Sequence, residues 1–182
     1  MSSKSVSQNK EKRARREIKP ALLIIDTQNK YLKVIPPRDK ELAIFFINML
    51  IGLFRDNNYP VIRIYHSEKG KSENPESEEF MYPPSIFIKP EDTMLIKNYS
   101  DSFNKTRLDE ILSNNGTNAV FLCGLSAVGC VLATMIGAMN HDYKAFIVKD
   151  AIMSHDTGFT RNVEMMFDAV SYNAVKLMIE GC

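Results

Sequence analysis

The sequence contains few cysteines and no long apolar segment. Three cysteines among 182 residues cannot form the disulfide framework of a small secreted domain, and an odd number leaves one thiol unpaired. We therefore expect a reducing, cytoplasmic setting. The aliphatic run at 21–25 ends at Asp26, whereas a membrane-spanning helix needs about 20 apolar residues. Because the run is also too short for the core of a signal peptide, we expect neither a membrane span nor a secretory leader.

Net charge is nearly absent, but the charged residues are unevenly distributed. The formal net charge is +1, to which residues 1–19 contribute +5 (seven Lys or Arg against two Glu) and residues 20–182 contribute −4 (16 against 20). The first segment is rich in Ser and Lys and almost free of large apolar side chains, so it is predicted to be a disordered basic tail. The remainder is mildly acidic, and nucleic acid is not its expected ligand.

The apolar and charged fractions, 45% and 25%, are those of a globular protein. Residues 20–182 are long enough for one domain with a substantial core. Short β-branched runs alternate with helical patterns along this part of the chain. Strands are predicted at 21–26, 61–65, 94–96, 119–123, 145–148 and 174–178, and helices at 39–55, 106–112, 128–139 and 161–170. This alternation predicts an α/β protein, a three-layer αβα Rossmann-like fold with a mainly parallel six-stranded sheet.

The longest predicted helix has one wide apolar face. Its apolar residues recur at the i, i+3, i+4 and i+7 spacing of a helix that buries one side. They are Leu42, Phe45, Phe46, Met49, Leu50, Leu53 and Phe54. Asp39 is the predicted N-cap, because its carboxylate can accept hydrogen bonds from the free backbone N–H groups of the first turn.

Chemically capable side chains follow three of the predicted strands. Asp26 ends the first strand, Lys97 ends the third, and Cys130 follows the fourth after a loop that contains glycine. Taken singly, each has an ordinary structural explanation, such as a turn-forming acid, a solvated lysine or a cysteine in a core. The carboxyl ends of parallel strands meet at one edge of a sheet, so we expect an acid, a cation and a thiol in one crevice. The first turn of a helix and a nearby ammonium are expected to lower the pKa of Cys130.

Motifs of several other enzyme classes are missing. Residues 27–30, after the first strand, contain no glycine that would let a dinucleotide pyrophosphate approach a helix. Segment 124–128 begins like the Gly-x-Ser-x-Gly elbow of a serine hydrolase but has Val128 in place of the second glycine. Cys123 and Cys130 are separated by six residues and are not a Cys-x-x-Cys redox pair. Cys123 and Cys182 are assigned no chemical role.

Three separated blocks of the sequence resemble the signature blocks of the isochorismatase-like cysteine hydrolases. The blocks are Leu-Leu-Ile-Ile-Asp-Thr-Gln at 22–28 with Tyr31, Lys97 followed by Phe103, Thr106 and Leu108, and Gly-Leu-Ser-Ala-Val-Gly-Cys-Val at 124–131. They occur in the order and at the spacing of that family, and the resemblance covers residues 20–178. Agreement of three blocks makes the resemblance fairly specific.

The resemblance implies a catalytic triad of Asp26, Lys97 and Cys130. It also implies a cis peptide bond between Leu125 and Ser126, and an oxyanion hole formed by the backbone N–H groups of Ser126 and Cys130. In this mechanism the aspartate accepts the thiol proton and the lysine keeps the anionic groups close and ionised. The thiolate then attacks an amide or ureide carbonyl, and water clears the resulting thioester.

The resemblance favours the branch of the family that needs no metal. Family members that act on isochorismate do not require a thiol nucleophile, so Cys130 points to hydrolysis of a C–N bond. Nicotinamidases of the family hold a divalent ion with an Asp and a pair of His between the acid and lysine blocks. That interval contains only His66 here, and one imidazole makes a poor transition-metal site. We therefore expect no metal and no cofactor.

The expected substrate is a small-molecule amide, with Tyr31, His66 and Leu125 lining its pocket. Val128 and Gly129 depart from the polar residues common before the family nucleophile, so a relative's substrate cannot be transferred. A homo-oligomer is expected, because the family commonly is oligomeric and methionine-rich helix faces could pack between subunits. These methionines are Met135, Met139, Met165 and Met166. The alternatives are an inactive binding or assembly protein, and a nicotinamidase-type or isochorismate-type hydrolase.

Overall fold

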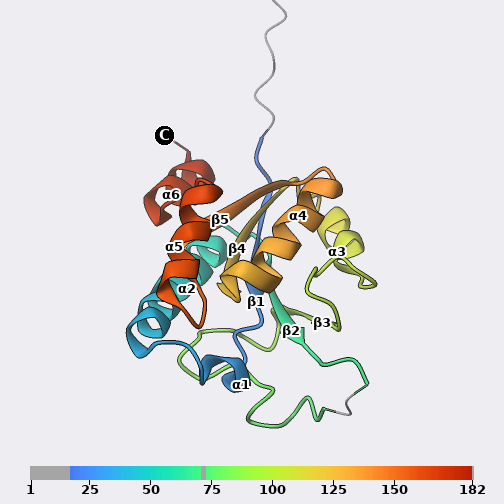
Figure 1. The fold of residues 1–182 in the computed structure, drawn as a ribbon. Coiled ribbons are helices and arrows are strands. Elements are labelled where there is room, and N and C mark those ends of the chain that lie inside the picture. Colours follow the sequence, from blue (N-terminus) through green and yellow to red (C-terminus); the bar gives the residue numbers. More distant parts are fainter. Residues whose placement is uncertain (1–16, 71–72, 182) are drawn as a thin grey trace, which may run out of the picture.

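The computed structural model describes residues 17–70 and 73–181, and Figure 1 shows their arrangement. The predicted basic tail lies outside the described residues except for its last three positions. The strands are β1 (Pro20–Ile25), β2 (Val61–His66), β3 (Thr93–Lys97), β4 (Ala119–Leu125) and β5 (Lys144–Met153). The helices are α1 (Asn29–Leu32), α2 (Pro37–Asp56), α3 (Leu108–Asn114), α4 (Leu132–Asn140), α5 (Thr157–Met166) and α6 (Tyr172–Glu180), and a π-helical turn, η1 (Ala127–Val131), leads directly into α4.

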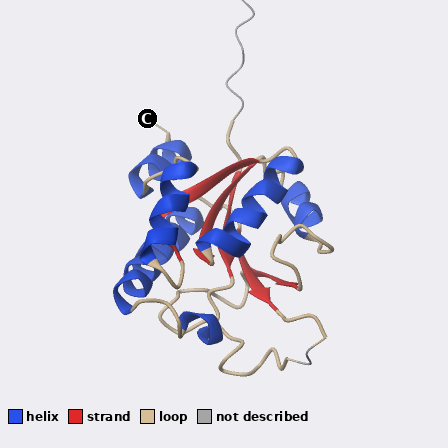
Figure 2. Ribbon diagram, viewed as in Figure 1, coloured by secondary structure: helices blue, strands red, loops and turns tan. Residues whose placement is uncertain are grey.

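The strands form one parallel sheet in the order β3-β2-β1-β4-β5, with helices on both faces (Figure 2). The central strand β1 is buried along its whole length because its side chains enter both layers. Leu22 and Ile24 belong to the apolar core that includes α2 and α6. Leu23 and Ile25 belong to the second core, which includes residues of α3, α4 and α5. The predicted three-layer α/β class is confirmed.

The predicted sixth strand at 174–178 is wrong, because these residues lie in α6. The Ser171 hydroxyl accepts a hydrogen bond from the Ala174 N–H and caps this helix. Val175, Met178 and Ile179 then pack on the α2 side of the sheet at helical spacing. Within the described residues the sheet has five strands, and only an isolated bridge from Val170 to Val148 continues it beyond β5.

Helix α2 differs from its prediction at its start and in its buried face. It begins at Pro37, whose ring suits the first helical position, so Asp39 lies in the first turn and is not the N-cap. The Asp39 carboxylate instead accepts a hydrogen bond of 2.5 Å from the Thr157 hydroxyl. Leu42 and Phe45, predicted to be buried, are 44% and 58% exposed. The core-facing residues are Ala43, Ile47, Leu50, Ile51, Leu53 and Phe54.

Of the four methionines expected between subunits, Met135 is buried in the core of the α3–α4 face. An intersubunit role for Met135 is therefore wrong. Met139, Met165 and Met166 are exposed, and association through them stays a prediction. Within the described residues, no helix is both long and apolar enough to cross a bilayer.

The carboxyl ends of β1, β2, β3 and β4 lie along the same edge of the sheet. His66 and Lys97 are register partners at the ends of β2 and β3, and Ile25 is the partner of Gly124. Gly124 has a φ of +105°, and a Cβ there would lie 2.1 Å from the carbonyl oxygen of Ile25. Only glycine allows this close approach, which brings the loop after β4 beside the end of β1.

Candidate active site

A buried ion pair joins the ends of β1 and β3. Asp26 follows β1 directly in a left-handed conformation, with a φ of 51° that aspartate tolerates better than most residues. The Lys97 ammonium donates a hydrogen bond of 2.7 Å to Oδ2 of Asp26. The two side chains are 0% and 4% exposed, so water screens their attraction little.

The Lys97 ammonium has two further contacts besides the one with Asp26. Its Nζ lies 3.2 Å from Nδ1 of His66 and donates a hydrogen bond of 3.1 Å to the carbonyl oxygen of Tyr99. A lysine ammonium carries three protons and has no acceptor capacity. The ammonium therefore lies between Asp26, His66 and the Tyr99 carbonyl and fixes the relative positions of Asp26 and His66.

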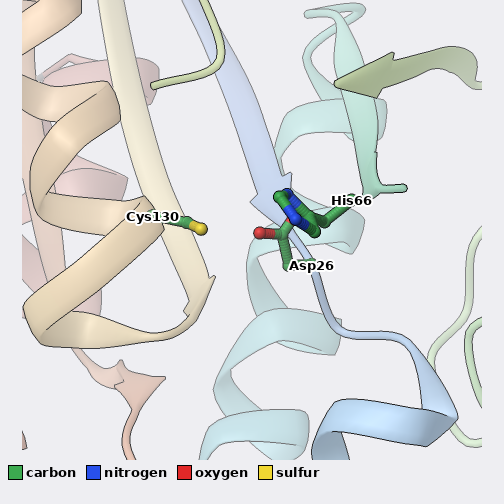
Figure 3. A group of neighbouring side chains, drawn as sticks. All are labelled: Asp26, His66 and Cys130. Atoms are coloured by element: carbon green, nitrogen blue, oxygen red, sulfur yellow. The ribbon is translucent and has the colours of Figure 1, made fainter. Parts of the chain in front are cut away.

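Cys130 is the third member of this group and lies beside Asp26. It directly follows Gly129, whose backbone is not helical (φ −123°, ψ −106°) and breaks η1, so Cys130 lies in the first turn of the helix that continues as α4, as predicted; its side chain is partly buried. Figure 3 shows its sulfur pointing toward Asp26 and His66, which lie together at the ends of β1 and β2. Ligating atoms of Asp26, His66 and Cys130 all lie within 4.8 Å of one another. Oδ1 of Asp26 is buried and has no hydrogen-bond partner within the described residues.

Burial controls the acidities of this group. It raises the pKa of Asp26, and the neighbouring Lys97 opposes that rise. Burial and the negative charge of Asp26 raise the pKa of Cys130 to about 11. The predicted lowering of the Cys130 pKa is therefore wrong, because desolvation and the adjacent carboxylate outweigh the ammonium. At neutral pH the resting sulfur is a thiol.

The loop before Cys130 has the backbone that the family resemblance implies. The peptide bond between Leu125 and Ser126 is cis. The Ser126 carbonyl accepts hydrogen bonds from the N–H groups of Gly129 (2.9 Å) and Val131 (3.2 Å), which closes the turn around the cysteine. The Ser126 hydroxyl lies 3.1 Å from that of Ser154, a fully buried residue after β5 that the sequence analysis missed.

His66 and Tyr31 lie beside this group, and a residue without a predicted role holds His66 in place. The buried Gln28 side chain accepts a hydrogen bond of 2.7 Å from the His66 N–H and donates one of 3.2 Å to the His66 carbonyl. The rings of Tyr31 and His66 meet edge to face, with centroids 6.1 Å apart. The position of Gln28 two residues after a strand-ending acid was the available signal for its role.

The separations among Asp26, His66 and Cys130 suit a metal ion, but their surroundings do not. The Lys97 ammonium contacts both Asp26 and His66. A divalent cation bound by these residues would therefore share a buried space with a positive charge, at a large electrostatic cost. A lone imidazole with a carboxylate already paired to lysine is a poor donor set for zinc or iron. The residues present do not fit the metal site of the nicotinamidases.

A hollow of about 900 Å³ is lined by other residues than this group. Residues from the start of α2, the end of β5 and α5 line it, and none of the predicted site residues is among them. Its lining contains neither cysteine nor histidine. We therefore assign the candidate active site to the sheet edge where Asp26, Lys97 and Cys130 meet.

Comparison with known proteins agrees with the fold. A family model described as the isochorismatase domain matches residues 20–175. The chain therefore belongs to the isochorismatase family, and the predicted isochorismatase-like hydrolase is confirmed at the level of the family.

Individual relatives are distant. An uncharacterized isochorismatase family protein, YddQ of Bacillus subtilis, is 29% identical over 136 residues, which are 72% of this chain and 76% of that protein. Maleamate amidohydrolase of Pseudomonas putida is 31% identical over 61 residues, only 34% of this chain and 29% of that enzyme. The crystal structure of N-carbamoylsarcosine amidase from Thermoplasma acidophilum shares the fold, with a TM-score of 0.72 and 24% identity over 85% of this chain and 95% of that one.

Proposed function

We propose that this chain is a metal-independent cysteine amidohydrolase that cleaves a C–N bond of a small amide or ureide. One observation carries the proposal. The Asp26 carboxylate is fixed at Oδ2 by Lys97, its buried Oδ1 has no hydrogen-bond partner within the described residues, and the Cys130 sulfur points toward the Asp26 side chain. An oriented base with one free oxygen beside a thiol is the arrangement that nucleophilic catalysis by cysteine requires.

In the proposed acylation step, Asp26 accepts the Cys130 proton as the sulfur bonds to the substrate carbonyl carbon. The carbonyl π electrons move to oxygen, and the oxyanion is stabilised by the backbone N–H groups of Ser126 and Cys130. When the tetrahedral intermediate collapses, its C–N bond breaks and the leaving nitrogen takes the proton from Asp26. An acyl group remains on sulfur as a thioester.

In the proposed deacylation step, Asp26 accepts a proton from water as the water oxygen attacks the thioester carbon. Collapse of this second intermediate breaks the C–S bond and releases a carboxylic acid, or a carbamic acid from a ureide. The sulfur regains its proton from Asp26. Each step needs Asp26 to gain and lose one proton, and its raised pKa makes it a stronger base than an exposed carboxylate.

The names of two similar proteins support a C–N substrate. One is a maleamate amidohydrolase and the other an N-carbamoylsarcosine amidase, so the first acts on an amide and the second on a carbamoyl group. In our proposal Tyr31, His66 and Leu125 line the substrate pocket. Leu125 is 5% exposed, so its side chain can supply an apolar wall but little contact area.

Intact-mass spectrometry after rapid acid quenching tests the proposal. The panel includes maleamate, N-carbamoylsarcosine, nicotinamide and isochorismate with simple amides and ureides. We expect an acyl adduct that maps to Cys130, and loss of adduct and turnover in Cys130→Ser. Cys123→Ala is the matched control, because this fully buried thiol lies inside β4 and its loss should leave the adduct intact.

Asp26→Asn separates catalysis from binding. We expect it to retain substrate affinity and to lower kcat by about 10²–10⁴, the usual contribution of a general base. Turnover by Cys130→Ser at the wild-type rate would refute covalent catalysis. Binding of panel members with no adduct and no turnover would instead support the inactive binding protein, and turnover confined to isochorismate or to metal-loaded protein would support the other two alternatives.

A further inference from the structure

Lys97 is buried and its ammonium is already held by contacts within the site, so it has little capacity to donate a hydrogen bond to a substrate. The ammonium contacts Oδ2 of Asp26 at 2.7 Å, the Tyr99 carbonyl at 3.1 Å and Nδ1 of His66 at 3.2 Å. Lys97 is also only 1% exposed. The groups that recognise the substrate away from its scissile carbonyl must therefore be other side chains at this edge of the sheet.

The contact with Lys97 determines which nitrogen of His66 carries a proton. An ammonium only donates, so Nδ1 must be the unprotonated acceptor and the proton of the neutral ring must reside on Nε2. Burial, together with the positive charge of Lys97, lowers the pKa of His66, which favours the neutral ring. Gln28 accepts a hydrogen bond from the His66 N–H and donates one to the His66 carbonyl, so the backbone that carries the ring is also held in place.

A second unused donor lies next to His66. The Tyr31 hydroxyl oxygen is buried and has no hydrogen-bond partner within the described residues. The Tyr31 ring contacts the His66 ring edge to face. The nearby Lys30 ammonium, 4.7 Å from the centre of the Tyr31 ring, is paired with Glu73. The chemistry left unused beside the thiol is therefore that of neutral N–H and O–H donors.

We propose that His66, held by Lys97 as the Nε2–H tautomer, and the Tyr31 hydroxyl are substrate-binding donors that select amides carrying a second sp² oxygen. This substrate class rests on the proposed amidohydrolase function. The second oxygen belongs to a carbonyl or to a carboxylate, and both accept hydrogen bonds from neutral donors. An alkyl group in its place would leave the buried Tyr31 hydroxyl and the His66 N–H without an acceptor, which disfavours binding.

The tautomer can be measured without turnover. The chain has three histidines, so ¹⁵N NMR of histidine-labelled Cys130→Ser gives three ring systems, and the same spectrum of a His66→Asn derivative identifies His66. We expect a neutral His66 ring between pH 6 and 8, with a protonated Nε2 and an unprotonated Nδ1. An Nδ1–H tautomer, or an imidazolium in this range, would overturn the inference.

The substrate class is tested with three probes that differ at one group. Malonamide carries a second carbonyl, malonamate carries a carboxylate, and butyramide carries an ethyl group at that position. We expect Cys130→Ser to bind at least one oxygen-bearing probe about tenfold or more tightly than butyramide, with a shift of the His66 Nε2 resonance on binding. Comparison of malonamide with malonamate shows which source of the oxygen is preferred. Equal affinity for all three probes, including no measurable affinity, would overturn the substrate class.

Matched variants at His66 separate a donor role from a structural one. The His66→Gln amide reaches the position of Nε2 and can keep the donor, whereas the shorter Asn amide reaches only the position of Nδ1 and can keep the acceptor for Lys97. We therefore expect His66→Gln to retain the tenfold preference for an oxygen-bearing probe, and His66→Asn and Tyr31→Phe to lose most of it. Equal loss in His66→Gln and His66→Asn would assign His66 a structural role. Failure of the proposed function would appear separately, as absence of an acyl adduct in the wild type.

Discussion

Replacement of Lys97 by methionine tests whether the site is organised by a buried ion pair. Methionine nearly matches the length of the lysine side chain and removes its charge and three hydrogen bonds. The Asp26 carboxylate, 3% exposed and 2.7 Å from the ammonium, then has no compensating charge. Breaking a buried pair by removing one partner destabilises a protein by about 3–5 kcal/mol. For a domain of this size the melting temperature should fall by about 10 °C or more.

The loss of stability should depend on pH, because the carboxyl group can escape its unpaired charge by taking up a proton. Burial raises the folded pKa of Asp26 above the 3.8 that is usual for an aspartate, so ionisation of Asp26 disfavours the folded state. The free energy of unfolding begins to fall as the pH rises through the pKa of Asp26 in the unfolded chain, and the fall is complete above its pKa in the folded protein. Lys97 lowers the pKa of Asp26 in the folded protein. In Lys97→Met this pKa should therefore be higher, and the variant should go on losing stability up to a higher pH than the wild type. The gap from the wild type should therefore widen as the pH rises.

Urea unfolding followed by circular dichroism at pH 5 and pH 8 measures this gap, and a double-mutant cycle supplies the control. The double variant Asp26→Asn/Lys97→Met has no buried charge at either position. It should recover most of the stability that Lys97→Met loses at pH 8. A Lys97→Met protein within 1 kcal/mol of the wild type at pH 8, or a double variant less stable than Lys97→Met, would refute the reasoning.

Three further outcomes follow from the structure. Alkylation of Cys130 by iodoacetamide should quicken about tenfold per pH unit from pH 7 to 10, because its pKa is about 11; intact mass measures it with Cys130→Ser as control, and a plateau near pH 8 would show that the pKa is low. Gly137→Ala should destabilise α4 by about 1–3 kcal/mol, because its Cβ would lie 2.3 Å from Oδ1 of Asp101. Thermal unfolding of both variants measures this effect. Gly52→Ala is the control, because its new Cβ in α2 would have no atom within 4 Å, and it should be neutral or stabilising. Equal melting temperatures of the two variants would contradict the prediction. Treatment with a chelator should leave turnover unchanged, because the Lys97 ammonium contacts the Asp26 and His66 side chains that would have to bind a metal. Loss of activity on chelation that zinc restores would contradict this.

The sequence was sufficient to predict a strand where the strand is buried on both faces, because such a strand is a continuous run of apolar residues. Residues 20–25 form such a run, and β1 is buried along its length. The same criterion failed at 174–178, because a short apolar stretch fits a strand or a helix equally well. The Ser171 cap and the packing of Val175 against the α2 face decide the matter, and both depend on where the rest of the chain lies.

The members of the site could be predicted, but their mutual contacts could not. Asp26, Lys97 and Cys130 follow strands whose carboxyl ends share one edge, which topology alone dictates. The contact of Lys97 with His66 depends on the register of β2 with β3, and a shift of one residue would direct these side chains to opposite faces. The pKa of Cys130 depends on how deeply the loop after β4 is buried. Neither quantity can be derived from the order of residues in the chain.

The raised pKa of Cys130 is compatible with catalysis because the proposed proton transfer conserves the charge of the site. A proton that moves from the sulfur to Asp26 moves one negative charge between two groups within 4.8 Å of each other. The Lys97 side chain stays 2.7 Å from Oδ2 of Asp26 and takes no part in this transfer. The buried pocket therefore never carries an extra uncompensated charge, which would be the costly event at low dielectric. A resting thiol that ionises only as it bonds to carbon needs a correctly placed carbonyl, and this ties activation of the nucleophile to the donors that position the substrate.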